Sequence, residues 1–201
     1  MPERADVIVC GVGGQGILLL AELLGTAALK SGLDVRVSEI HGMAQRGGSV
    51  ICHVRVGRHV RAPTVLDGRA DILVALEPVE ALRAIRYLGP QSLALVSTRP
   101  IRPVMVSLGM ATYPDLEQVR SALEAAAGRV IFVDALGLAE EAGNPITQNM
   151  VMAGALCATG AFPARREAML EAMRELVPAR YLEVNLRAFE LGERAVRELG
   201  R

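Results

Sequence analysis

The sequence has 201 residues, of which 51% are hydrophobic and 22% charged, a balance typical of a globular domain and not of a disordered chain. Its 22 acidic and 22 basic side chains cancel, so no net field attracts nucleic acid or a membrane surface. The apolar runs are shorter than the roughly 20 residues of a membrane-spanning helix, and residues 1–6 do not resemble a signal peptide. We therefore expect a cytoplasmic protein that binds neither nucleic acid nor membranes.

The first forty residues predict a strand, a glycine turn, a helix and a second strand. An apolar run over residues 6–10 is followed by Gly11-Val12-Gly13-Gly14-Gln15-Gly16 and by a helical pattern over residues 17–30. Gly32 ends the helix, and residues 33–40 form the next strand. In this βαβ unit, Gly11 and Gly13 would permit the tight turn, and Gly16 would let the helix pack closely on its strand.

The glycine turn is the first candidate binding site. Backbone amides at the start of a helix have no partner within the helix, and the helix dipole makes that end positive. Phosphate and carboxylate groups bind readily there. We therefore predict a ligand or cofactor site formed by Gly11, Gly13, Gly14, Gln15 and Gly16. The side chain of Gln15 both donates and accepts hydrogen bonds, which suggests a more selective contact than amides alone provide.

A polar loop after the second strand is the second candidate site. We predict that it contacts substrate or a partner through His41, Gly42, Met43, Gln45, Arg46, Gly47, Gly48 and Ser49. Loops at the carboxyl ends of parallel strands line one crevice, so this loop should face the glycine turn. Arg46 offers a fixed cation for a carboxylate or phosphate. The alternative is that Arg46 pairs with Glu39 across the mouth.

The middle of the chain predicts further units of an α/β sheet. Residues 50–56 alternate like a half-exposed strand, which Gly57-Arg58 could turn into a hairpin through Val60. We expect a strand buried on both faces at 71–76, further strands at 92–97 and 130–133, and helices at 77–88 and 115–127. The proline-rich link before the second of these helices could hold an edge strand at 104–108.

The last third of the chain is predicted to be helical, at 135–142, 147–158, 164–177 and 181–199. Asn144 should start a turn and Thr147 should cap a helix, although Asn144 and Asn149 could also face a ligand. No linker or repeat divides the chain, so we expect residues 1–201 to form a single domain. The expected fold is α/β: a doubly wound, mostly parallel, Rossmann-like sheet with a β-hairpin insertion and a helical C-terminal extension.

A glycine turn after a strand also permits a dinucleotide. Glu39, about 20 residues beyond the turn, could bind the ribose and would make the chain a stand-alone NAD(P)-dependent oxidoreductase. Such an enzyme needs a proton donor, and none of the histidines has an obvious partner. We expect His53 and His59, in or near the predicted hairpin, to be solvated. A non-catalytic binding or scaffold protein is a third interpretation.

The sequence offers no catalytic or metal-binding arrangement. Cys10, Cys52 and Cys157 lie far apart without a Cys-x-x-Cys pair, so we expect no disulfide, no zinc site and no iron–sulfur cluster held by this chain alone. We expect them to be small buried residues. No Ser-His-Asp or paired-carboxylate motif is evident. We therefore assign no metal ligand and no catalytic residue.

Three segments, Gly11 to Gly16, His41 to Val50 and Gly143 to Asn149, resemble the gamma-type domain of the 2-oxoacid:ferredoxin oxidoreductase family. The similarity spans most of the chain. The stretch from Gly42 to Val50, followed by His53-Val54-Arg55, most resembles the beta subunit of the indolepyruvate type. The related gamma subunits of pyruvate and ketoisovalerate enzymes, which are the alternative, usually carry a different loop before their arginine and paired glycines.

The resemblance implies a subunit of an enzyme that oxidatively decarboxylates an aryl pyruvate, reduces ferredoxin and releases an aryl-acetyl-CoA. This chemistry uses thiamine diphosphate and iron–sulfur clusters. The sequence has no cysteine cluster, and Leu66-Asp67-Gly68 lacks the first glycine of the Gly-Asp-Gly start of a thiamine diphosphate motif. The resemblance therefore implies that a larger alpha subunit carries both cofactors and that CoA is a co-substrate. This chain would bind none of them firmly and would be inactive alone.

Overall fold

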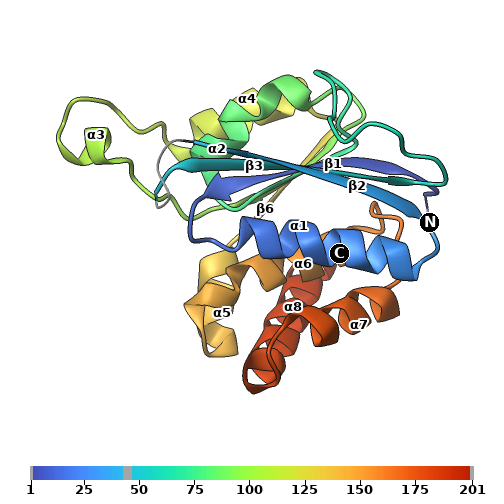
Figure 1. Cartoon of the computed structure of the whole chain (residues 1–201). Helices are drawn as coiled ribbons and strands as arrows, with labels where there is room; N and C mark the ends of the chain where they lie inside the picture. Colours follow the sequence, from blue (N-terminus) through green and yellow to red (C-terminus); the bar gives the residue numbers. More distant parts are fainter. Residues whose placement is uncertain (1, 43–46, 200–201) are drawn as a thin grey trace.

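Six strands form one mixed sheet with the order β2-β3-β1-β4-β5-β6 in the computed structural model, which describes residues 2–42 and 47–199 (Figure 1). Four strands are parallel: β1 (Ala5–Val12), β4 (Ile72–Ala75), β5 (Leu93–Ser97) and β6 (Arg129–Val133). Every residue of β1, β4 and β5 is buried, as continuous apolar runs predict for central strands. These strands form the centre of the core.

The remaining strands, β2 (Asp34–His41) and β3 (Ser49–Gly57), form an antiparallel hairpin at one side of the sheet. The hairpin expected through Val60 is wrong, because β3 ends at Gly57 and residues 58–66 contain no strand. Strand β3 also pairs antiparallel with β1, and therefore separates β1 from β2 within the expected βαβ unit. Because β3 runs back beside β1, the loop after β2 comes directly next to the glycine turn.

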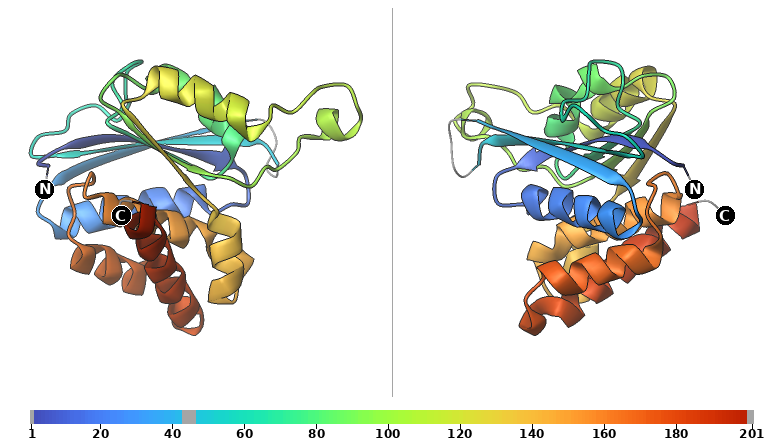
Figure 2. Two further views of the ribbon diagram at one scale, coloured as in Figure 1. Left: turned by 180° about the vertical axis from the view of Figure 1, so that it is seen from behind. Right: turned by 45° about the vertical axis from the view of Figure 1, so that its right-hand side comes forward.

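Helices cover both faces of the sheet (Figures 1 and 2). One face carries α2 (Pro78–Arg83), a 3-10 turn (Ile85–Tyr87) and α4 (Leu116–Ala126). The other face carries α1 (Ile17–Lys30), α5 (Ala135–Ala142), a 3-10 turn (Pro145–Thr147), α6 (Gln148–Thr159), α7 (Arg166–Leu176) and α8 (Ala179–Leu199). This three-layer arrangement confirms the expected doubly wound α/β class. Within the described residues, no helix combines the length and apolar character needed to cross a membrane.

A lobe formed by residues 101–113 projects from the carboxyl edge of the sheet and is visible in every view (Figures 1 and 2). The edge strand expected at 104–108 is wrong, because Val104–Ser107 forms a single helical turn, α3. Its apolar residues resemble a strand in sequence, but the lobe leads away from the sheet and has no strand to pair with. The N-cap of α3 is Pro103, whose φ of −60° suits a helix start.

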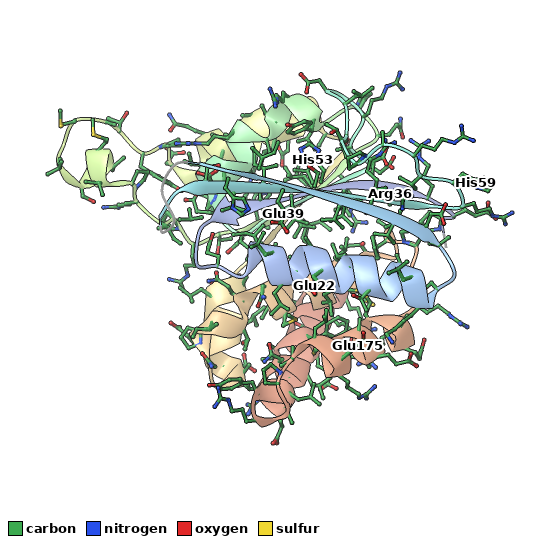
Figure 3. All side chains as sticks on the ribbon, in the orientation of Figure 1. Glu22, Arg36, Glu39, His53, His59 and Glu175 are labelled. Carbon is green, nitrogen blue, oxygen red and sulfur yellow. The ribbon has the colours of Figure 1, made fainter. Side chains whose placement is uncertain are left out.

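His53 is buried, so the expectation that it is solvated is wrong. Its ring lies on the α2 side of the sheet, where the segment before β4 covers it, and its Nδ1 accepts a hydrogen bond from the backbone N–H of Val65 at 3.1 Å (Figure 3). The ring of Tyr87 packs against it edge to face, with centroids 5.2 Å apart. His59 is exposed, as expected, and follows the end of β3 that lies away from the glycine turn.

Helices α6 and α8 cross at two glycines. A Cβ atom added at Gly154 would lie 1.9 Å from the carbonyl oxygen of Phe189, and one added at Gly192 would lie 1.9 Å from that of Val151. Both obstacles are backbone atoms of the facing helix, which cannot move without separating the helices. The glycines, which are unfavourable inside isolated helices, are therefore required for this contact.

We predict that Gly154→Ala or Gly192→Ala lowers the free energy of unfolding by about 1 to 3 kcal/mol, because the two helices must move apart. Denaturant unfolding followed by circular dichroism measures this loss. Gly25→Ala in α1 is the matched control, since its added Cβ meets only side-chain methyl groups, of Val35 at 3.3 Å and Val37 at 3.6 Å. Equal stability of the Gly154 and Gly25 variants would contradict the close crossing.

We also predict that His53 makes folding sensitive to acid. Burial, and secondarily the guanidinium of Arg86, lowers the pKa of His53, so the folded protein prefers the neutral ring. Stability is therefore complete above the unfolded pKa of about 6.5 and decreases as the pH falls from there towards the lower folded pKa. Denaturant unfolding at neutral and mildly acidic pH should show a smaller acid-dependent loss for His53→Gln than for the wild type or His59→Gln. Equal losses in all three proteins would refute this role.

Candidate functional site

The glycine turn and the loop after β2 meet at the carboxyl end of β1, as the sequence predicted. The backbone N–H of Gly13 donates to the carbonyl of Gly48 at 2.8 Å, and Gly47 N–H donates to the carbonyl of Gly13 at 3.5 Å. At the base of the loop, Gly42 N–H donates to the carbonyl of Ser49 at 3.0 Å. Three further residues of the predicted site lie outside the described residues: Met43, Gln45 and Arg46.

Gly14 and Gly16 adopt backbone conformations that side chains disfavour. Their φ angles are +105° and +77°, and Gly16 is the N-cap of α1. A Cβ on Gly16 would lie 2.5 Å from Nδ2 of Asn149. The sequence predicts that this glycine lets α1 pack on its strand, but the close contact that it permits is with α6. Helix α1 has neither a side-chain cap nor an acidic residue in its first turn. Its positive end is thus suited to an anion.

Gln15 is buried and serves the fold itself. Its Oε1 accepts a hydrogen bond from Val12 N–H at 2.8 Å, and its Nε2 donates to the carbonyl of Leu76 at 2.8 Å. The Nε2 atom also lies 3.4 Å from Oε1 of Gln148. Gly11, in β1 and not in the turn, has no side chain and leaves room for this carboxamide. The selective ligand contact expected of Gln15 is replaced by contacts within the protein.

The segment before α6 joins the same site from the other side. Asn144 starts a turn as predicted, since its Oδ1 accepts from Ile146 N–H at 3.1 Å. Thr147 is the N-cap residue of α6, as predicted, but its hydroxyl donates to the carbonyl of Asn144 at 2.8 Å and makes no cap hydrogen bond. Asn149 is buried, and its Nδ2 donates to the carbonyl of Gly16 at 3.2 Å. This bond ties α6 to the start of α1.

A pocket of about 310 Å³ lies between the glycine turn and the C-terminal helices. Its lining is mostly apolar with three asparagine side chains, and consists of Gly14, Gly16, Leu19, Asn144, Ile146, Thr147, Asn149, Val177, Pro178, Tyr181 and Asn185. The starts of α1, α6 and α8 border it. The pocket can therefore accept an anionic group at the helix ends and an apolar group against its wall. It brings together four of the predicted residues: Gly14, Gly16, Asn144 and Asn149.

Two buried carboxylates that the sequence analysis missed lie on the opposite side of the glycine turn. Glu77 caps α2 by accepting from Glu80 N–H at 2.9 Å, while its other oxygen accepts from Ile101 N–H at 3.2 Å and from the hydroxyl of Tyr113. Glu80 accepts a hydrogen bond from the hydroxyl of Ser49. Burial raises the pKa of Glu80, and the Ser49 bond opposes this rise.

These two carboxylates were recognisable only in part from sequence. The order Glu77-Pro78 after a buried strand predicts a helix start. A charged residue such as Glu77 directly after a parallel strand also indicates a candidate binding site, because ligands bind at that edge of the sheet. The spacing of Glu77 and Glu80 gave no motif. In the structure, Glu77 accepts hydrogen bonds from the two ends of the lobe, and Glu80 accepts one from Ser49 at the start of β3.

His41 and Glu39 lie together at the exposed end of β2, with Nε2 of His41 3.2 Å from a carboxylate oxygen of Glu39. A dinucleotide fold places its acidic residue on the strand beside the glycine turn. Here β3 intervenes, which puts β2 two strand spacings, or about 10 Å, from β1. Glu39 is therefore poorly placed to bind the ribose of NAD(P).

The described residues contain no group of three or more His, Cys, Asp and Glu side chains placed to hold a metal ion. Cys10 and Cys52 are buried as expected, whereas Cys157 is only partly buried. Burial raises the pKa of Cys10, and it raises that of Cys157 to about 11. The thiols therefore stay protonated at neutral pH and are poor metal ligands.

The sequence has close relatives of known family. A family model described as pyruvate ferredoxin/flavodoxin oxidoreductase matches residues 6–195. The indolepyruvate oxidoreductase subunits IorB of Thermococcus kodakarensis and Pyrococcus horikoshii are each 49% identical over 198 residues, which cover 98% of this chain and 98% of theirs. The pyruvate/ketoisovalerate oxidoreductases common subunit gamma of Thermococcus kodakarensis is 28% identical over 90% of each chain.

Solved structures share the fold at lower identity. The gamma subunit of a keto/oxoacid ferredoxin oxidoreductase from Geobacter sulfurreducens has a TM-score of 0.70 and 22% identity, covering 97% of this chain and 99% of that one. The 2-oxoglutarate:ferredoxin oxidoreductase from Magnetococcus marinus, solved with coenzyme A bound, has a TM-score of 0.75 and 18% identity, covering 98% of this chain and 32% of that one. With the family match over residues 6–195, the chain belongs to the pyruvate ferredoxin/flavodoxin oxidoreductase family.

Proposed function

We propose that this chain is the smaller subunit of an indolepyruvate:ferredoxin oxidoreductase, which converts aryl pyruvates to aryl-acetyl-CoA and reduces ferredoxin. The observation that carries this proposal is the 49% identity to IorB subunits over 98% of both chains. Identity to the pyruvate/ketoisovalerate gamma subunit is lower, at 28% against 49%, which favours the indolepyruvate type over that alternative. The position of Glu39, with β3 between its strand and the glycine turn, counts against a stand-alone NAD(P) enzyme.

A larger alpha subunit would supply thiamine diphosphate and the iron–sulfur clusters, and ferredoxin would bind through the complex. Three separated cysteines, of which two are fully buried, do not fit a cluster ligand set. The bound cofactors would stabilise the carbanion and carry the electrons. This chain's contribution would be binding and positioning at the glycine turn, because the described lining of the pocket there contains no Asp, Glu, His, Lys or Arg.

The pocket at the glycine turn is our candidate for the anionic part of CoA. The uncapped start of α1 suits a phosphate, and the apolar wall formed by Leu19, Val177 and Pro178 suits a less polar part of the molecule. Contact of the loop from His41 to Ser49 with substrate or with the larger subunit remains a prediction. Arg46, in that loop, is a second predicted contact for an anion.

Reconstitution tests the subunit assignment. The chain is co-expressed with the larger subunit of the same organism, and reduction of ferredoxin is measured with indolepyruvate and CoA. We expect turnover only when both subunits are present. Turnover of an oxoacid by the isolated chain, or saturable binding of NADH followed by fluorescence, would overturn the proposal.

A charge in the first turn of α1 tests the CoA site. Leu18 is exposed in this turn, so Leu18→Asp adds an anion where a helix tolerates it but where a phosphate would be repelled. We expect the KM for CoA to rise about two- to fivefold, from an interaction of roughly 0.3 to 1 kcal/mol, with little change in the KM for indolepyruvate. Leu18→Asn is the neutral control. Equal KM values for the Asp and Asn variants would exclude CoA from this pocket.

A further inference from the structure

The lobe formed by residues 101–113 exposes an unusual amount of apolar surface. The exposed fractions are 73% for Val104, 65% for Leu108, 69% for Met110, 50% for Met105 and 41% for Ile101. Five large side chains at these exposures give a patch on the order of 500 Å², which is near the upper end for a monomer and is often functional at that size. The methionines suit a contact surface because their side chains adapt to a partner.

The lobe is nevertheless well defined, because one buried carboxylate holds both of its ends. The same oxygen of Glu77 accepts from the N–H of Ile101, where the lobe begins, and from the hydroxyl of Tyr113, where it ends. Inside the lobe, Leu108 N–H donates to the carbonyl of Val104 and Met110 N–H to that of Met105, both at 2.9 Å. The chain thus forms a defined element whose helical turn buries none of its residues against the body.

We propose that this lobe is the docking element for the larger, cofactor-bearing subunit, and that its apolar side chains insert into a recess of that subunit. The inference rests on the proposed function. The only charged residue between Pro100 and Pro114 is Arg102, which is exposed, so the recess should be apolar with a carboxylate near its rim.

The area of the patch argues for a larger partner over a second copy of this chain. A symmetric contact between two lobes would bury only the patch on each side, which falls short of the roughly 800 Å² per partner of a stable complex. A larger subunit can take up the lobe and cover the adjoining mouth of the sheet as well. In the Magnetococcus marinus enzyme, the matching fold is about a third of a longer chain, which joins it to further parts of that protein.

The position of the lobe supports a continuous interface with the mouth. Helix α2 holds the lobe through Glu77 and holds Ser49, next to the loop after β2, through Glu80. The same loop bonds to the glycine turn through Gly48 and Gly13. A partner seated on the lobe would therefore also reach the edge of the predicted binding site.

Assembly of the two subunits tests the proposal. The larger subunit is immobilised, and the affinity of the purified chain for it is measured. We expect Val104→Asp and Leu108→Asp each to weaken binding at least tenfold, as is usual for buried apolar anchors. Their melting temperatures should stay at the wild-type value, because both side chains are exposed in the free chain. Leu29→Asp and Leu66→Asp, at exposed apolar positions elsewhere, are matched controls that should bind normally.

The anchor of the lobe is tested separately. Tyr113→Phe removes one of the two bonds that the lobe makes to Glu77 and leaves its apolar surface unchanged. We expect faster hydrogen exchange at residues 101–112 and binding weakened severalfold. Tyr87→Phe, which loses a hydrogen bond from Arg86 outside the lobe, is the control and should change neither measurement.

The outcomes separate this inference from the proposed function. If the wild type binds the larger subunit and the Val104 and Leu108 variants bind equally well, the lobe is not the docking element, although the subunit assignment stands. If those variants only dissociate a self-associated form of this chain, the occupant is a second copy and the proposal is overturned. If the wild type does not bind the larger subunit at all, both proposals fall.

Discussion

The buried carboxamide of Gln15 joins parts of the chain that are far apart in sequence. It accepts from Val12 at the end of β1 and donates to Leu76 after β4, with Gln148 of α6 beside it. A buried amide without these partners would be costly, so the glycine turn takes this form only when β4 is in place. The turn is therefore stabilised by the assembled sheet as well as by its own glycines and Gln15.

The C-terminal helices are consequently part of the site and not an appendage to a finished domain. Asn149 of α6 bonds to Gly16, and only a glycine at position 16 leaves room for it. Helix α6 is held in turn by α8 through the crossing of Gly154 and Gly192. A wall of the pocket thus depends on helix packing some distance from the glycine turn, which ties the geometry of the pocket to the stability of the last third of the chain.

Much of this architecture could be predicted because local patterns decide it. The apolar runs of β1 and β4, the glycine turn and the four C-terminal helices follow from periodicity and from glycine and proline positions. The order in which the strands pair, and the loops that cover the sheet, could not be predicted in the same way. Alternation in β3 shows that its two faces differ, but not that it inserts between β1 and β2, nor that a loop covers His53.

The meeting of the two glycine-rich loops was predicted correctly, whereas the partners of individual side chains were not. Residue types indicated where two glycine-rich loops meet, yet whether an amide such as Gln15 serves a ligand or the fold depends on distant partners. The same holds for Glu77 and Glu80, whose partners lie in the lobe and at the start of β3.

The glycine turn has two sides with different surroundings, and this arrangement would suit the proposed subunit, which would bind a ligand and join a partner. One side faces the pocket between α1, α6 and α8, and the other bonds to the loop that leads into β3. The loop bonds to Gly13 and the pocket is lined by Gly14 and Gly16, so the two sides of the turn are adjacent in the chain. Because the Gln15 carboxamide already orders the turn in the folded chain, a ligand bound there would meet little entropic cost from it.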